Sequence, residues 1–233
     1  MTQKQKTYKP EKTNNFNMIP SDPKGSLDES FFNKSNGTLV LIDAGFLSKL
    51  SKHFGNGVYL KYDLIKFSKN LAFKENKTCK GIFYYTAPPF QSPIPSEEEK
   101  RRKDRYDKFV NKLKEKGVVV REGRCQRLKL DGKFIYKQKG VDTLMTIDLM
   151  SIPIKHPYIK EIILIASDSD FVPVINTLNS INIKLVLYTY YEKGRDAEFS
   201  TSNELIKSVY KYVLLKKEDF DTAPLNKNGT NNK

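Results

Sequence analysis

The stretch Glu161-Ile-Ile-Leu-Ile-Ala-Ser-Asp-Ser-Asp-Phe-Val-Pro-Val-Ile175 is the part of the chain from which the rest can be placed. Its first part, residues 162–166, is a short apolar run rich in β-branched residues, which predicts a strand buried on both faces of a parallel sheet. Apolar side chains then recur at helical spacing, at Phe171, Val174, Ile175 and Leu178. A buried strand that passes directly into an amphipathic helix indicates an α/β fold.

Two acids, Asp168 and Asp170, lie at the junction between this strand and helix. Ligands bind at the carboxyl ends of the strands in open parallel sheets. Paired carboxylates with no basic neighbour in sequence favour a divalent cation held by oxygen atoms. For Asp170, N-capping of the next helix is an equally good interpretation. For Asp168, at the strand end, we favour the site.

Working outward, four more apolar runs predict strands at residues 38–43, 81–85, 118–121 and 184–188. Helical patterns lie between them: one opens with the capping box at residues 96–99, and another ends at Pro153. Asp131-Gly132 lies between two alternating runs and predicts a β-hairpin. We therefore expect a doubly wound α/β domain over residues 38–215, with residues 203–215 helical or mixed. Polar segments flank it: residues 1–37 are expected to be disordered, and 216–233 to form a loose tail.

The composition points to an anionic partner. The 233 residues carry a formal net charge of +14, which attracts polyanions. RNA or DNA is the first candidate and an anionic membrane surface the second; a Lys- and Asn-rich genome bias would also give this composition. Two distant cysteines and two histidines do not predict a zinc site or disulfides, which fits a reducing cytoplasm. Neither a membrane span nor a signal peptide is expected.

Three acids are placed to meet. Asp43 ends the first predicted strand, Asp142 opens the helix before residue 162, and Asp168 follows that strand. If these two strands are neighbours, the carboxylates converge on the crevice where the winding reverses. Mg²⁺ or Mn²⁺ would relieve their repulsion and could activate a water next to a phosphate. An acidic crevice in a basic protein suits hydrolysis of a phosphodiester backbone.

Three segments together resemble the NYN family, the LabA/DUF88 branch of the PIN-like nuclease superfamily. They are Leu41-Ile-Asp43-Ala-Gly45, Lys139-Gly-Val-Asp142-Thr-Leu-Met-Thr-Ile-Asp148-Leu149 and Ala166-Ser-Asp168-Ser-Asp170-Phe-Val-Pro-Val-Ile175. The resemblance spans about residues 38–215. It implies a three-layer PIN-like fold, with a five-stranded, mostly parallel sheet of order 3-2-1-4-5 and helices on both faces. It also implies an Mg²⁺- or Mn²⁺-dependent endoribonuclease.

Carried over by position, the resemblance makes Asp43, Asp142 and Asp168 both catalytic residues and metal ligands. Asp170 would be a catalytic residue that acts as an outer ligand. Asp148 also matches an acid of the family, but six residues after Asp142 it faces another side of the helix, which favours a structural role. Many relatives have Asn a few positions after the first Asp, where this chain has Phe46.

Basic residues on the helix that follows the capping box and on the hairpin are candidates for binding RNA phosphates, chiefly Arg101, Arg102, Arg105, Arg124 and Arg127. Aromatic residues interleaved with them could stack on unpaired bases, namely Tyr84, Tyr85, Phe90, Tyr106 and Tyr136. Each has an ordinary structural interpretation too, because exposed helices are often charged and strand aromatics often form the core.

The first functional hypothesis is therefore a metal-dependent ribonuclease. The second is a non-catalytic RNA-binding or regulatory module. The third is a sugar-nucleotide transferase, since Asp168-Ser169-Asp170 also fits an Asp-x-Asp metal motif, although the chain length and the Lys-Gly-Val-Asp element argue against it. A homo-oligomer is compatible with the sequence.

Overall fold

A six-stranded parallel sheet forms the centre of the protein. A computed structural model describes residues 36–192, 199–200 and 202–225. The strands of the sheet are β1 (Gly37–Asp43), β2 (Thr78–Thr86), β3 (Val119–Glu122), β6 (Glu161–Ile165), β7 (Lys184–Thr189) and β8 (Lys211–Leu214). Their order is β3-β2-β1-β6-β7-β8. The five predicted strands take the predicted order, but the prediction of five was wrong because β8 adds a sixth.

The two strands expected to flank the crevice, β1 and β6, are direct neighbours. They pair in parallel from Thr38 opposite Glu161 to Ile42 opposite Ile165. Every residue of β1 from Gly37 to Ile42 is buried, and so is β6 from Ile162 onward. From β1 the sheet extends one way through β2 and β3 and the other way through β6, β7 and β8. The winding therefore reverses between β1 and β6, where ligands bind in such sheets.

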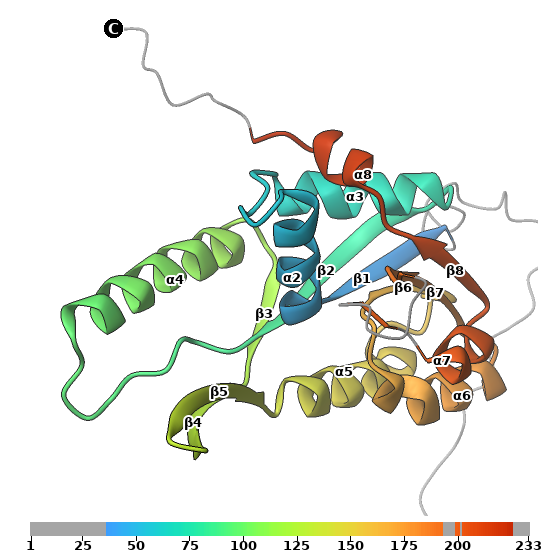
Figure 1. The fold of residues 1–233 in the computed structure, drawn as a ribbon. Helices are drawn as coiled ribbons and strands as arrows, with labels where there is room; N and C mark the ends of the chain where they lie inside the picture. Colours follow the sequence, from blue (N-terminus) through green and yellow to red (C-terminus); the bar gives the residue numbers. More distant parts are fainter. Residues whose placement is uncertain (1–35, 193–198, 201, 226–233) are drawn as a thin grey trace, which may run out of the picture.

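Helices cover both faces of the sheet (Figure 1). One face carries α2 (Ala44–Phe54), α3 (Leu64–Lys74), α4 (Glu97–Glu115) and α8 (Lys217–Asp221). The other carries α5 (Val141–Lys155), α6 (Val172–Ser180) and α7 (Asn203–Ser208), with a short 3₁₀ turn, η1 (Ser169–Phe171), before α6. Alternate residues of β1 supply the two cores, since Val40 and Ile42 face the first set of helices and Leu39 and Leu41 the second. None of the described helices is both long and apolar enough to cross a membrane.

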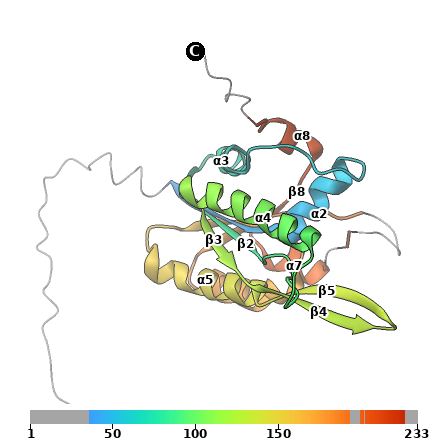
Figure 2. The same cartoon turned by 90° about the vertical axis from the view of Figure 1, so that its left-hand side faces the viewer.

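A separate two-stranded antiparallel ribbon projects from the body between β3 and α5 (Figures 1 and 2). Its strands are β4 (Arg124–Leu130) and β5 (Lys133–Lys139). Asp131 and Gly132 join them with positive φ angles of 49° and 75°, the conformation of a tight hairpin turn with native twist. The hairpin prediction is confirmed.

Three further expectations need correction. The strand β8 lies within residues expected to be helical or mixed, and it gave no strand signal because only Val213 of its four residues is even partly buried. The tail is not loose from residue 216, because α8 follows and its Phe220, 1% exposed, packs on the core. Helix α5 continues through Pro153 to Lys155, because a proline in the last turn costs one hydrogen bond while Ile152 stays buried. Residues 1–35 and 226–233 lie outside the described residues.

Candidate functional site

A cavity of about 420 Å³ opens at the carboxyl ends of β1 and β6. Asp43, Asp142 and Asp168 all line it, which brings the three predicted site acids together. We call it the acidic cavity; its other walls come from Gly45, Phe46, Lys49, Gln138, Val141, Ser167, Phe199 and Ser200. Phe46 therefore contributes an aromatic wall.

Local turns fix two of the three carboxylates. Asp43 is the N-cap of α2, and its Oδ1 accepts hydrogen bonds from the backbone N–H groups of Gly45, at 2.8 Å, and Phe46, at 3.2 Å. Asp168 is the N-cap of η1, and its Oδ1 accepts from the N–H of Asp170 at 2.9 Å. The strand-to-helix turns thus hold both acids in place through one oxygen each.

The acids of the cavity disfavour one another's ionisation. Burial raises the pKa of Asp43 to about 6; the two N–H donors oppose this rise, and the charges of Asp142 and Asp168 add to it. Burial also raises the pKa of Asp142, with contributions from Asp168 and Asp170. Nearby positive charge would relieve this repulsion.

The donor set suits Mg²⁺ or Mn²⁺, because these ions prefer carboxylate oxygens and keep several waters when few protein ligands are offered. Among the residues that the structure describes, no three His, Cys, Asp or Glu side chains lie close enough together to hold a metal ion. An ion in the acidic cavity would therefore contact these carboxylates in part through water. Asp43, Asp142 and Asp168 are the residues that would hold it.

Asp170 lies apart from the other three. Its side chain is exposed and does not line the acidic cavity. The N-cap interpretation for Asp170 is wrong, because Asp168 caps η1 and no side chain caps α6. Its influence on the site is electrostatic, through its contribution to the raised pKa of Asp142.

A second cavity, of about 670 Å³, lies beside the first and shares Gly45, Lys49 and Gln138 with it. We call it the basic cavity, because Lys49, Lys52 and Arg102 line it and its walls, all within the described part of the chain, include no carboxylate. Sequence reasoning missed Lys49, Lys52 and Gln138. The two lysines follow Asp43 at spacings that place them on one side of α2, which was the available signal.

The five predicted RNA-binding arginines are spread over three places. Arg102 lines the basic cavity. Arg101 and Arg105 are exposed on α4 and pair with Glu98, at 3.1 Å and 3.8 Å. Arg124 is exposed at the start of β4, and Arg127 lies farther along that strand over two aromatic rings.

The predicted stacking aromatics also separate. Tyr84 and Tyr85 are buried in the two cores, and the small exposed part of Tyr84 lines the basic cavity. Tyr106 lines the basic cavity, and its hydroxyl donates a hydrogen bond to Glu122 at 2.9 Å. Phe90 and Tyr136 lie together at the hairpin, with ring centroids 5.7 Å apart.

Asp148 belongs to a different cluster, which we call the Asp148 network. The side chain is 5% exposed and accepts hydrogen bonds from Arg121, at 2.7 Å and 2.5 Å, and from the Tyr85 hydroxyl, at 3.1 Å. Burial alone would raise the pKa of Asp148, but Arg121 and Tyr85 lower it. These contacts tie α5 to β3 and β2, in keeping with the predicted structural role.

Comparisons with known proteins agree with this architecture. The family model for the NYN domain matches residues 38–216. A crystal structure of a protein of unknown function from Vibrio parahaemolyticus superimposes with a TM-score of 0.52 at 17% identity, covering 80% of this chain and 96% of that one. At that identity the likeness concerns the fold alone. No curated protein matches the sequence.

Proposed function

The chain belongs to the NYN domain family, a PIN-like nuclease-type domain, and from this premise we propose that it is a metal-dependent ribonuclease of the LabA/DUF88 branch. One observation carries the proposal. Three carboxylates line a cavity at the switch point of the sheet, and that cavity shares a wall with a basic one. Acids that attract a cation and bases that attract phosphates are thus adjacent, as hydrolysis of an RNA backbone needs.

The basic cavity would bind the RNA backbone. Lys52 of α2 and Arg102 of α4 both line it, so a strand lying in this cavity would meet positive charge from two helices. Lys49 lines both cavities, which places a cation at the point where a phosphate would pass from one to the other.

The acidic cavity would hold the reacting phosphate and its water. Bound Mg²⁺ or Mn²⁺ supplies an activated water and stabilises negative charge on the phosphate. Asp43 and Asp168 are fixed by their capping bonds, so their carboxylates need little reorganisation to act together. Asp142, in the first turn of α5, completes the negative charge of the cavity.

Cleavage of a labelled RNA with one stem and one unpaired loop tests the proposal. The wild-type protein should cut it with Mg²⁺ or Mn²⁺ and lose that activity in EDTA. Asp168→Asn should abolish cleavage while retaining the cap, because an Asn side chain also accepts from the Asp170 N–H. Asp221→Asn, the same change of charge on the exposed surface of α8, is the matched control and should cut normally. Wild-type activity of Asp168→Asn in metal would refute the proposed site.

A second candidate is a non-catalytic RNA-binding module. The wide spacing of the acids favours it, since no three described acidic, His or Cys side chains meet tightly enough to hold a metal. The effect of metal on stability, binding and cleavage distinguishes the two functions. A nuclease gains thermal stability with Mg²⁺ and cuts RNA, whereas a binding module binds RNA equally well in EDTA and leaves it intact.

A further inference from the structure

The hairpin has two unlike faces. Cross-strand partners share a face, and Cys125–Gln138, Arg127–Tyr136 and Lys129–Phe134 lie opposite one another on the same side. The alternate pairs Gln126–Lys137, Leu128–Ile135 and Leu130–Lys133 lie on the other. The first face, which we call the stacking face, therefore carries both aromatic residues of β5 together with two of the basic residues of β4.

The stacking face leads into the site. Gln138, at its base, lines both the acidic and the basic cavity. Tyr136 and Phe134 follow along β5 at intervals of two residues, about 7 Å each along an antiparallel strand. Both rings are accessible, with Phe134 55% and Tyr136 50% exposed. The hairpin thus presents a row of rings that starts at the cavity wall and runs outward along the ribbon.

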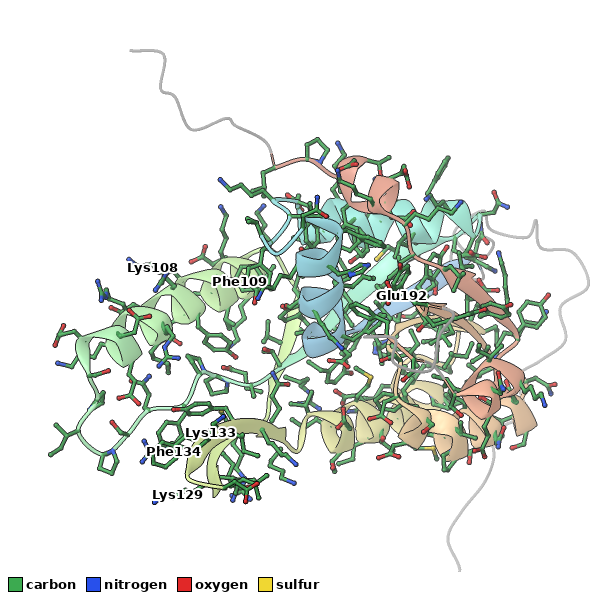
Figure 3. The ribbon with its side chains drawn as sticks, viewed as in Figure 1. Lys108, Phe109, Lys129, Lys133, Phe134 and Glu192 are labelled. Atoms are coloured by element: carbon green, nitrogen blue, oxygen red, sulfur yellow. The ribbon has the colours of Figure 1, made fainter. Side chains whose placement is uncertain are left out.

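Contacts at the base and along the strand hold this row in place. The Arg127 guanidinium lies over the Phe134 ring, at 4.5 Å from its centroid, and over that of Phe90, at 4.7 Å. Gly123 permits the close approach at the base, because a Cβ there would lie 2.5 Å from the Lys139 carbonyl oxygen. Figure 3 shows Lys129 and Phe134 together on the hairpin, on the same side of the molecule as Lys108 and Phe109 of α4.

We propose that the stacking face binds the bases of an unpaired RNA strand and guides that strand into the acidic cavity. Exposed rings interleaved with cations bind single strands, because every unpaired base offers a π-face and its backbone offers phosphates. Bases within a duplex are already stacked and cannot lie on Tyr136 or Phe134. This inference rests on the proposed nuclease function and adds to it the surface that would hold the unpaired strand beside the cut, namely the stacking face of the hairpin.

Binding measured in EDTA tests the stacking face without cleavage. The probes are a fluorescein-labelled 12-nucleotide oligouridine and a labelled RNA duplex of the same length, followed by anisotropy. Phe134→Leu and Tyr136→Leu keep the charge and an apolar side chain while removing the rings. Each should weaken oligouridine binding about tenfold, leave its salt dependence unchanged and leave duplex binding unchanged.

A pair of charge-matched variants separates the two faces. Lys129→Gln removes one positive charge from the stacking face, and Lys137→Gln removes one from the opposite face. The first should weaken oligouridine binding more than the second, whereas a diffuse electrostatic attraction would make the two losses equal. Thermal melting of each variant shows that the fold persists.

Equal losses from the two lysine variants, or full affinity of both leucine variants, would overturn the inference. Neither result would contradict the nuclease proposal, which is tested by metal-dependent cleavage and its loss in Asp168→Asn. Conversely, if the RNA stays intact in the cleavage assay but binding in EDTA depends on the rings, the nuclease proposal is refuted and RNA binding by the stacking face is retained.

Discussion

Two acids of helix α5, Asp142 and Asp148, differ in their partners and in the direction in which their pKa values are shifted. Asp148 is buried but paired with Arg121 and Tyr85, and its pKa is lowered. Asp142 lies at the start of α5 with its side chain largely exposed, and partial desolvation of its carboxylate together with the charge of Asp168 raises its pKa. The first carboxylate is satisfied within the protein and stabilises the fold. The second contributes to an excess of negative charge that a ligand can neutralise.

Replacing each of the two acids with alanine tests this difference. Asp148→Ala should lower the free energy of unfolding by roughly 3 kcal/mol, because it leaves Arg121 without its partner. Asp142→Ala should leave the free energy of unfolding unchanged or raise it, since a repulsive charge is lost. Urea unfolding without metal measures both values. Equal losses would mean that Asp142 has a structural partner as well.

Metal should sharpen the contrast. An ion that binds only the folded state adds about 2.7 kcal/mol of stability at a concentration of 100 times its dissociation constant. Melting curves with increasing Mg²⁺ or Mn²⁺ should show this rise in the wild-type protein and not in Asp168→Asn. Without metal, Asp168→Asn should be at least as stable as wild type. An Asp168→Asn variant that unfolds would instead identify Asp168 as a structural acid.

The contributions of Asp43 and Asp148 to stability should depend on pH in opposite directions. The folded-state pKa of Asp43 is raised to about 6, so its ionisation destabilises the metal-free protein progressively as pH rises from about 4 to about 6. We expect Asp43→Asn to recover about 1–2 kcal/mol at pH 7, after allowance for solvent screening, and nothing at pH 4. The lowered pKa of Asp148 acts below pH 4, where its stabilisation is lost as pH falls. Unfolding free energies of wild type and Asp43→Asn across this range test the sign; a constant difference would contradict it.

The smallest effect concerns the arginines of α4. Arg101 donates to Glu98 at 3.1 Å and is partly satisfied within the protein, whereas Arg102 lies 3.9 Å from the same residue and lines the basic cavity. Arg102→Ala should weaken RNA binding a few-fold and reduce the salt slope by about one. Arg101→Ala should do less. RNA titrations at several salt concentrations compare them, and a larger loss from Arg101→Ala would place the RNA on the outer side of α4.

Most strands of the fold could be predicted because the sequence patterns that indicate them are local. Apolar runs such as residues 162–166 located five of the six strands of the sheet, and Asp131-Gly132 located the hairpin turn. The grouping of Asp43, Asp142 and Asp168 in one cavity followed from a rule about where parallel strands end. Strand β8 could not be found, because Lys211 and Tyr212 are exposed and its pairing with β7 involves the backbone.

The rest of the site depends on contacts between segments far apart in sequence. Nothing near Gln138 indicates that it closes a wall shared by two cavities. Tyr85 and Tyr136 have the same residue type and similar neighbours, yet one is buried on the central sheet and the other is exposed on a ribbon. The two rings differ because the strand of Tyr85 lies in the central sheet and the strand of Tyr136 lies in the separate ribbon.

The hairpin also bears on the solubility of the protein. A ribbon of two strands has two unpaired edges, and unpaired edges invite pairing with another chain and aggregation. Here Lys129, Lys133, Lys137 and Lys139 are all exposed along those edges, and lysine is the residue that most often protects them. The same positive charges that would draw RNA therefore keep neighbouring ribbons apart. We expect a chain stripped of these lysines to form intermolecular sheets at lower concentrations than the natural chain.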